Sequence, residues 1–535
     1  MHETLWICLG LIITVSFLVL AARKLSIAYP IFLTMAGLVL SIIPGIPAIK
    51  IDPDLIFLVV LPPILFDATQ STSVKALWKW RRMISVLALG FVLLTSCTVA
   101  VISVWLIPGF SYAQGFLLGA IISPPDAAAA TSVLRYVPLP RGMINMLEGE
   151  SLLNDASSLT IFRFALVAVI TNNFVWYDAL GGFFMLTGLG IVVGLGFGLI
   201  FYCIYRWLPT TTDLDVALSL VFPYLIYLTA ESFNASGVLA VVSGGLFISY
   251  QNRFLFSHQS RQKSSAVWKA LIFILNAVIF LLIGLQMPGI ISGVKSLPLM
   301  TSIGIGVLIA VLVIFIRLIA AQIASIFTSY ISKYISVAWA EPGWKNPFIM
   351  SWSGMRGVVS LASAFSIPVL MDGGKQFPHR DLILFITFIV TIITLVGQGL
   401  ALPWVVKKIG TDPIPGEKDE REQILAMQEV LFEAGSKMLS SRFEKEMEVN
   451  DLLKNRLEFI KIHSEVNKAC STGKDVKKEI SAAIDQFRKI MLKVAEHERK
   501  QLNAFCKDPG FNDEVVRKLQ KRLDIEEEWL DNLEK

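Results

Sequence analysis

The sequence predicts an all-α polytopic membrane protein of about thirteen transmembrane helices, followed by a helical cytosolic tail. Three observations predict this class. Hydrophobic residues make up 54% of the 535 residues and charged residues only 17%, a balance that a soluble domain could not cover with polar surface. Apolar runs of about 20 residues, the length that crosses a bilayer core, recur as far as Val406. After that point the chain becomes highly charged.

The apolar runs divide residues 1–406, the predicted transmembrane domain, into thirteen segments. The first run has no Lys or Arg ahead of it and no small-residue cleavage site behind it, so we interpret it as a retained helix rather than a signal peptide. The expected segments are 4–22, 28–44, 54–73, 83–107, 112–134, 147–171, 178–205, 213–231, 235–250, 265–287, 302–331, 347–370 and 381–406.

The basic residues of the predicted loops indicate the orientation, because Lys and Arg are retained on the cytoplasmic side during insertion. One set of alternate loops carries fifteen Lys and Arg residues, whereas the other carries only Lys50, Lys295, Lys375 and Arg380. We therefore expect the N-terminus outside and the C-terminus in the cytoplasm. The sequence pI of about 8.8 reflects the inner loops and requires no nucleic-acid partner.

Residues 407–535 form the predicted cytosolic helical domain. This region of 129 residues holds 25 Lys and Arg against 27 Asp and Glu, and apolar residues recur at helical spacing in "ILAMQEVLFEAGSKMLSSRF". We interpret it as an accessory domain that packs on itself or on a second copy, with a regulatory sensor as the alternative. The five cysteines of the chain show neither a metal-binding nor a disulfide spacing, and no cofactor is expected.

The segment "LEGESLLNDASSLTIFRF", residues 147–164, carries the strongest candidate site. A charged group at bilayer depth costs roughly 2.5–3.5 kcal/mol, so such a group is usually paired, hydrated or on an ion path. Helical spacing stacks Ser151 with Asp155 and Glu150 with Asn154. The first stripe offers a carboxylate and a hydroxyl oxygen to a small hard cation, and the second is suited to holding the site in shape. A structural ion pair within the bundle is the alternative.

Two further segments predict interrupted helices. In "GFLLGAIISPPDAAAATSVL", Pro124 and Pro125 remove two backbone donors just before Asp126, which favours a broken helix over a simple kink. The freed carbonyls can coordinate a cation, and the restarting half-helix offers its amides to the Asp126 carboxylate. In "SWSGMRGVVSLASAFSIP", Gly354 and Gly357 bracket Arg356 and permit a bend.

The remaining intramembrane charges need partners as well. A buried guanidinium at Arg356 is untenable in lipid without an acidic partner, and we expect Glu150 to be that partner. Asp67, in "LPPILFDATQ", is predicted either to face the ion path or to lie at the membrane interface. Arg163 and Arg317 are expected to serve structure or an interface rather than chemistry.

Taken together, "LEGESLLNDA", "ISPPDAAAATSVL", "LPPILFDA" and "SGMRGVVSLA" resemble the sodium/proton exchanger superfamily, in its bacterial cation:proton antiporter-one branch. The resemblance covers about residues 1–406 and rests on four motifs in the right order. It implies a multi-pass protein of the bacterial plasma membrane that forms a homodimer. It also implies that each protomer has a dimerisation domain and a six-helix core domain, with inverted repeats and two crossed broken helices.

The resemblance also implies roles for individual residues. The Asn-Asp pair of the family falls on Asn154 and Asp155, and Asp155 would bind cation and proton in turn. Ser151 would be a ligand, and Asp67 a ligand or a carboxylate that gates the site. The broken helix of the family usually reads Ser-Pro-Thr-Asp-Pro, whereas this chain has Pro125 in place of the threonine. Only the Pro125 carbonyl could therefore serve as a ligand there.

These observations predict a secondary antiporter that exchanges a monovalent cation for a proton by alternating access, for pH and cation homeostasis. Na+ is the first choice of cation, with K+ and Li+ as alternatives. Because position 154 is Asn, the pair has no second titrating carboxylate, and we expect electroneutral one-for-one exchange. A cation channel or another proton-coupled transporter is the alternative, and a coupled-flux assay would identify a channel. The chain has no Gly-x-Gly-Asp signature of an intramembrane protease and no phosphate loop, so we expect no enzymatic activity.

Overall fold

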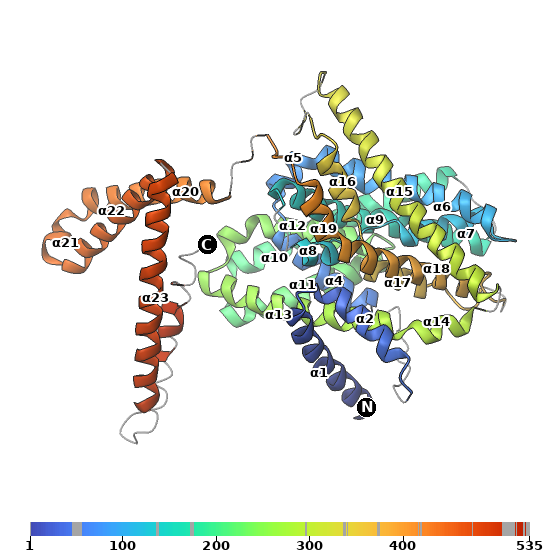
Figure 1. Ribbon diagram of the computed structural model, residues 1–535, viewed down its shortest axis with the longest axis horizontal. Coiled ribbons are helices and arrows are strands. Elements are labelled where there is room, and N and C mark those ends of the chain that lie inside the picture. Colours follow the sequence, from blue (N-terminus) through green and yellow to red (C-terminus); the bar gives the residue numbers. More distant parts are fainter. Residues whose placement is uncertain are drawn as a thin grey trace. The chain divides into compact units, whose positions relative to one another are not determined.

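The protein is all-α in the part of the chain that the computed structural model describes, apart from an isolated bridge between Leu370 and Gln376 (Figure 1). This result confirms the predicted fold class. The described residues are 2–44, 56–134, 139–171, 176–294, 297–334, 337, 339, 341–371, 375–415, 417, 420–472, 474–505, 519–520, 522–527 and 530.

The chain divides into two compact units, Met1–Pro415 and Gly416–Lys535. The helices of the first unit are α1 (His2–Lys24), α2 (Tyr29–Ser41), η1 (Ile56–Val60), α4 (Leu61–Ser71), α5 (Val74–Ser85), η2 (Val86–Phe91), α6 (Val92–Leu106), α7 (Tyr112–Ile122), α8 (Ala127–Leu134), α9 (Arg141–Thr171), α10 (Trp176–Trp207), α11 (Thr212–Ser232), α12 (Gly237–Leu255), α13 (His258–Leu285), α14 (Met287–Gly293), α15 (Leu299–Ile331), α16 (Lys345–Trp352), α17 (Val358–Phe365), α18 (Arg380–Ile392), η3 (Ile393–Gln398) and α19 (Gly399–Ile409).

Each of the thirteen expected segments coincides with helical structure in the described residues. Seven helices there are long and apolar enough to cross a membrane: Val74–Leu106, Arg141–Thr171, Gly181–Trp207, Thr212–Ser232, His258–Leu285, Leu299–Ile331 and Arg380–Ile409. Tyr29–Ser41, Ile56–Ser71 and Tyr112–Ile122 are shorter apolar helices. The count of thirteen spans stays a prediction.

Both interrupted helices that the sequence predicts are present. The first stops at Ile122 and restarts at Ala127, and the second stops at Trp352 and restarts at Val358. Each pair therefore consists of two short half-helices, α7 with α8 and α16 with α17.

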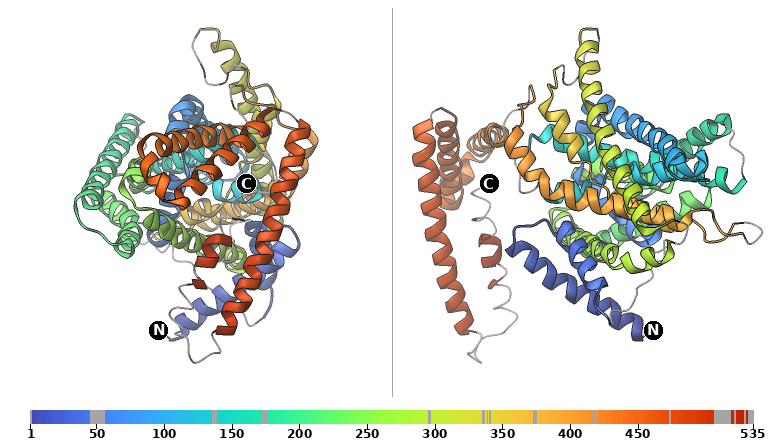
Figure 2. Two further views of the ribbon diagram at one scale, coloured as in Figure 1. Left: turned by 90° about the vertical axis from the view of Figure 1, so that its left-hand side faces the viewer. Right: turned by 45° about the vertical axis from the view of Figure 1, so that its right-hand side comes forward.

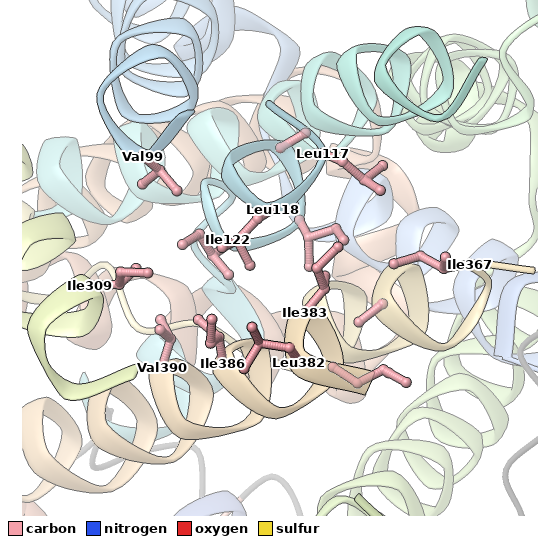
Figure 3. Packing of buried hydrophobic residues seen from close by; sticks show 14 of the residues in the cluster. Val99, Leu117, Leu118, Ile122, Ile309, Ile367, Leu382, Ile383, Ile386 and Val390 are labelled. Atoms are coloured by element: carbon pink, nitrogen blue, oxygen red, sulfur yellow. The ribbon is translucent and has the colours of Figure 1, made fainter. Parts of the chain in front are cut away.

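The buried apolar side chains of the first unit define two helix bundles. One, which we call the site bundle, comprises α5–α9 and α15–α19, whose side chains form two large cores. Figure 3 shows part of one core, where Ile122 of α7 and Ile386 of α18 pack near each other. The other, which we call the scaffold bundle, comprises α4 and α10–α13 and has its own core. A fourth core joins α1, α2 and η1 to α13, α17 and α18.

Small residues bring the helices of each bundle into close contact, as is common where helices pack in lipid. A Cβ atom on Gly119 of α7 would lie 2.7 Å from the Cα atom of Ser96 of α6, and a Cβ atom on Gly244 of α12 would lie 2.7 Å from the backbone oxygen of Gly194 of α10. These backbones are too close to admit a larger side chain.

The second unit consists of α20 (Glu420–Arg442), α21 (Glu444–Val449), α22 (Asp451–Thr472) and α23 (Lys474–Phe505). Within this unit α22 packs against both α20 and the long helix α23 (Figure 2). Its assignment as a separate cytosolic domain from residue 407 onward stays a prediction.

Candidate functional site

The Asn154–Asp155 pair lies near the middle of α9 and is buried. Asn154 is 0% exposed and Asp155 is 8% exposed. Three nearby hydroxyl groups on the same helix, Ser157, Ser158 and Thr160, donate to carbonyls of α9 itself. Such hydrogen bonds satisfy hydroxyl donors within a helix, so the Asp155 carboxylate does not depend on these three groups.

The first break lies directly beside this pair. Pro124 and Pro125 occupy the gap between α7 and α8, as their missing backbone donors require. The side-chain nitrogen of Asn154 donates to the carbonyl of Pro125 over 3.4 Å. This contact accords with a positioning role for Asn154, and it directs one lone pair of the Pro125 carbonyl toward an amide.

Asp126 connects the two breaks. Its backbone N–H donates to the carbonyl of Met355 over 2.7 Å. Its carboxylate accepts from the N–H groups of Ala129 in α8 and Val358 in α17, over 3.3 and 3.4 Å. Because the first N–H groups of a helix have no partner within the helix, this one carboxylate caps two half-helices at their positive ends. The two broken helices therefore cross at their breaks.

Gly357 makes this crossing sterically feasible. A Cβ atom at this position would overlap the Asp126 carboxylate. The sequence suggested a glycine that permits a bend, and the structure adds that the glycine leaves room for a carboxylate from the other broken helix.

The acidic residue expected to pair with Arg356 pairs with a different arginine in the structure. Glu150 instead forms an ion pair with Arg317 of α15, with Nη2 2.7 Å from Oε1. Both side chains are buried, at 1% and 4% exposure. The prediction of a Glu150–Arg356 ion pair is therefore wrong. The partner of Glu150 is Arg317, and this buried ion pair accords with the structural role expected of Arg317. The available signal was an arginine near the centre of a long apolar run, which demands a buried acid.

Arg356 is satisfied by carbonyl groups. Its Nε donates to Ile122 over 3.0 Å and its Nη1 to Gly354 over 2.9 Å, while its backbone N–H donates to the Thr394 hydroxyl. Ile122 is the last residue of α7, where carbonyls lack helical partners and carry partial negative charge. The C-terminal end of α7 thus presents the partial negative charge that stabilises the Arg356 guanidinium, in place of the Glu150 carboxylate.

Two carboxylates act on each other at the crossing. The Asn154–Pro125 hydrogen bond joins the segments that carry Asp155 and Asp126, and the negative charge of Asp126 disfavours a negative charge on Asp155. A cation or a proton between or on these groups would relieve that repulsion. Ser151, one turn before Asp155 on α9, is half-buried. Within the described residues, no three or more His, Cys, Asp or Glu side chains gather as a metal-binding group.

Asp67 lies apart from these contacts. It is half-buried on α4 in the scaffold bundle, where the positive charge of Lys269 on α13 acts on it. The adjacent Phe66 packs against Phe222 and Trp268. Its role as a ligand or gate stays a prediction.

The geometry defines a class of protein: a polytopic membrane transporter whose buried carboxylate lies beside two crossed, interrupted helices. Residues 10–408 match the sodium/hydrogen exchanger transmembrane family, and the chain belongs to that family. The match confirms the resemblance that the motifs suggested.

Individual relatives agree with this assignment. The chain is 31% identical to a sodium, potassium, lithium and rubidium/H(+) antiporter of Bacillus pumilus, over 71% of the chain and 58% of the relative. It therefore spans little more than half the length of that protein. It is 28% identical to an uncharacterized Na(+)/H(+) exchanger of Mycobacterium tuberculosis, over 94% of the chain and 92% of the relative. The sodium proton antiporter MjNhaP1 of Methanocaldococcus jannaschii shares the fold, with a TM-score of 0.59 at 19% identity over 76% of the chain and 99% of MjNhaP1.

Proposed function

We propose that the protein exchanges a monovalent cation for a proton across a bacterial plasma membrane, and that Asp155 carries both. The observation that carries this proposal is the burial of Asp155 on α9, next to an Asp126 carboxylate that caps both broken helices. A buried carboxylate is costly when it is charged and alone, so it takes up a proton or a cation. Because both bind the same oxygens, they compete, and competition is the basis of exchange.

The residues near Asp155 have separate proposed roles in positioning the site, binding the cation and favouring its loaded form. Asn154 orients the first break through the Pro125 carbonyl, and Ser151 and that carbonyl are the proposed additional cation ligands. Asp126 repels the empty, charged form of Asp155 and thereby favours the loaded form. The buried Glu150–Arg317 ion pair ties α9 to α15 and keeps Asp155 at a constant position within the site bundle.

Transport follows if the site bundle moves relative to the scaffold bundle. The loaded site carries no uncompensated charge, whereas the empty Asp155 carboxylate meets a higher barrier in a medium of low dielectric constant. This difference couples the two ions. With Asn at position 154, one proton replaces one monovalent cation, and the exchange is electroneutral. In proteoliposomes, a membrane potential that drives transport at balanced ion gradients would rule out electroneutrality.

Na+ is the proposed cation, with K+ and Li+ as alternatives. A hydroxyl ligand is missing at position 125, and the Bacillus pumilus relative is named for four different alkali cations, so a broad selectivity is the alternative to test. Cation-induced proton release across a Na+, K+, Li+ and Rb+ series in everted vesicles would rank them. The functional unit is proposed to be a homodimer with the N-terminus outside and the C-terminus in the cytoplasm.

The central test is Asp155→Asn in the full chain, because the change keeps the size of the side chain and removes its charge. We expect cation-dependent proton movement in proteoliposomes to disappear while the thermal unfolding temperature stays near that of the wild type. Asp213→Asn, which changes an exposed carboxylate on α11, is the matched control and should retain exchange. Wild-type exchange by Asp155→Asn would refute the assignment. Cation flux without proton counter-movement in the wild type would indicate a channel instead.

A further inference from the structure

One face of α9 packs on the scaffold bundle and ends in a charged residue. Leu152 and Ala156 are buried in the core of the scaffold bundle, and Leu159 packs against it. Residue 163 continues this face, because positions 152, 156, 159 and 163 follow helical spacing. The contact between α9 and the scaffold bundle is thus apolar over two turns and becomes ionic at Arg163.

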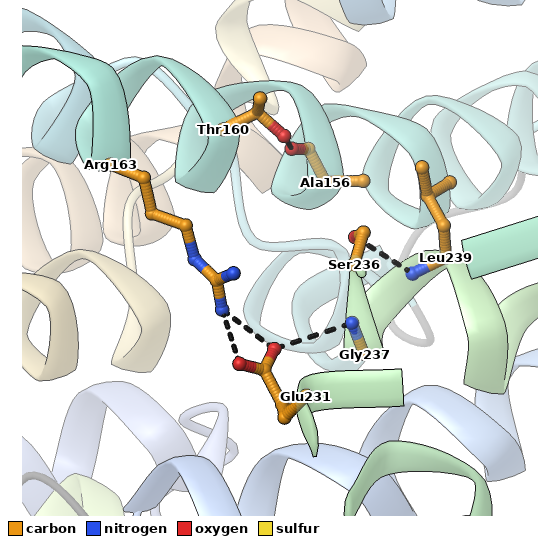
Figure 4. Close-up of polar contacts among 7 residues, drawn as sticks. All are labelled: Ala156, Thr160, Arg163, Glu231, Ser236, Gly237 and Leu239. Atoms are coloured by element: carbon orange, nitrogen blue, oxygen red, sulfur yellow. Dashed lines mark hydrogen bonds and ion pairs between the residues drawn. The ribbon is translucent and has the colours of Figure 1, made fainter. Parts of the chain in front are cut away.

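Arg163 forms an ion pair across this contact. Its Nη2 lies 2.6 Å from both carboxylate oxygens of Glu231, which is in the last turn of α11 (Figure 4). Glu231 also accepts a hydrogen bond from the N–H of Gly237, the first residue of α12, over 3.3 Å. The site bundle and the scaffold bundle are therefore joined by a directional ionic contact beside apolar ones.

The surroundings of this pair suit a contact that opens and closes. Arg163 is 42% exposed and Glu231 is 30% exposed, in contrast to the fully buried Glu150–Arg317 pair. Glu231 is one residue from the C-terminal end of α11 and Gly237 begins α12, so the pair lies where these helices end. A long arginine side chain near a helix end can extend to the membrane surface, where ion pairs are weak. After Arg163 separates from it, Glu231 would still accept a hydrogen bond from the Gly237 N–H and lie at the positive N-terminal end of α12. Apolar contacts such as those of Leu152 and Ala156 have no preferred direction and permit sliding.

The position of the pair along the helices indicates which side it closes. It joins the C-terminal ends of α9 and α11 to the N-terminal end of α12. These ends must lie on one side of the membrane, and the distribution of basic loop residues places that side outside.

We propose that the Arg163–Glu231 ion pair is a latch: it holds α9, the helix that carries Asp155, against the scaffold bundle and keeps the site closed to the outer side of the membrane. Each transport cycle opens the latch and forms it again. This inference rests on the proposed antiport function. Arg163 and Glu231 are positioning residues, because neither touches the Asp155 site in the described contacts, and they act through the movement of α9.

The first test compares the two sides of the membrane. In proteoliposomes of defined orientation, Glu231→Gln should change the ratio of the inside to the outside apparent KM for the cation by about fivefold, the shift expected for the loss of an exposed ion pair. Arg163→Gln should produce the same shift, and the double variant should add nothing to either single change. A structural role alone would lower the amount of folded protein without changing this ratio.

The matched control is the Lys263–Asp213 ion pair. It joins α13 to α11 within the scaffold bundle at 3.0 Å and does not involve α9. Asp213→Asn should leave the KM ratio unchanged. An unchanged ratio in Glu231→Gln and Arg163→Gln, or additive shifts in the double variant, would overturn the latch. Absence of exchange in the wild type would refute the proposed function instead.

The second test blocks the movement directly. In a full chain whose five cysteines are replaced by Ala, Arg163→Cys and Glu231→Cys would be joined by a reducible bifunctional thiol reagent. We expect the cross-linked protein to lose exchange and to regain it on reduction, while the same treatment at positions 213 and 263 has no effect. Exchange at an unchanged rate in the fully cross-linked protein would show that α9 does not need to leave Glu231.

Discussion

The two ion pairs of α9 differ in where they lie and in what they can do. Glu150 pairs with Arg317 inside the site bundle, with both side chains at 4% exposure or less. Arg163 pairs with Glu231 between the two bundles, near the ends of α11 and α12, where both side chains are partly exposed. Breaking the first leaves an uncompensated charge in a buried core, whereas breaking the second leaves two partly exposed charges near helix ends. The difference teaches that burial decides whether an ionic contact is a permanent part of a membrane protein or one that can be exchanged.

The largest expected effect on stability is at the buried Glu150–Arg317 ion pair. Glu150→Gln should lower the free energy of unfolding by about 3–5 kcal/mol, because the Arg317 guanidinium loses its carboxylate in a buried place. Denaturation of the purified protein in detergent, followed by intrinsic fluorescence, would measure the change. Replacing both residues, as Glu150→Gln with Arg317→Met, should recover part of the loss. A single variant as stable as the wild type would mean that water reaches this pair.

A smaller effect is expected at the crossing of the broken helices. Gly357→Ala should cost about 1–3 kcal/mol, because its Cβ atom would displace the Asp126 carboxylate from the start of α17. Exchange should fall with stability, since Asp126 acts on Asp155. Gly304→Ala is the control, because a Cβ atom on Gly304 of α15 meets no atom within 4 Å. Equal stability of both variants would contradict the crossing geometry.

Arg380 offers a test at intermediate exposure. Its side chain is 19% exposed, and its guanidinium donates to the carbonyls of Phe365, the last residue of α17, and of Ile367, two residues beyond it. Arg380→Gln should lower stability by about 1 kcal/mol, because carbonyls at the end of a helix favour a positive charge. The loss should shrink at high salt in a thermal unfolding series. A loss as large as that of Glu150→Gln would show that exposure is a poor guide to the strength of these contacts.

The smallest effect on stability is expected at the latch. Glu231→Gln should change the free energy of unfolding by about 1 kcal/mol or less, even though it changes the ratio of apparent KM values. The same unfolding assay applies, with Asp213→Asn as the control. A loss of several kcal/mol would mark the Arg163–Glu231 pair as a structural contact and would remove the contrast between the two pairs.

The sequence predicted the two breaks and the buried Asn154–Asp155 pair because these signals are local. Pro124 and Pro125 interrupt a helix wherever they stand, and Asn154 and Asp155 are conspicuous in an apolar segment. The partner of Glu150 could not be predicted in the same way. Arg317 and Arg356 both needed a negative partner, and nothing in the residues near them indicated which one would face Glu150. Glu231 was not singled out, because an acidic residue at the end of a helix resembles an ordinary surface residue.

By itself, the sequence determined the membrane class, the positions of the helices, the two breaks and the buried Asn154–Asp155 pair. Hydrophobic length, missing proline donors and the cost of charge in lipid act within a single segment, so they can be read along the chain. Only the tertiary structure decided that Asp126 caps both half-helices, that Arg317 neutralises Glu150 and that Arg163 reaches Glu231. Each of those contacts depends on which helices pack side by side, because a charge is satisfied by whichever opposite charge or dipole lies nearest in space.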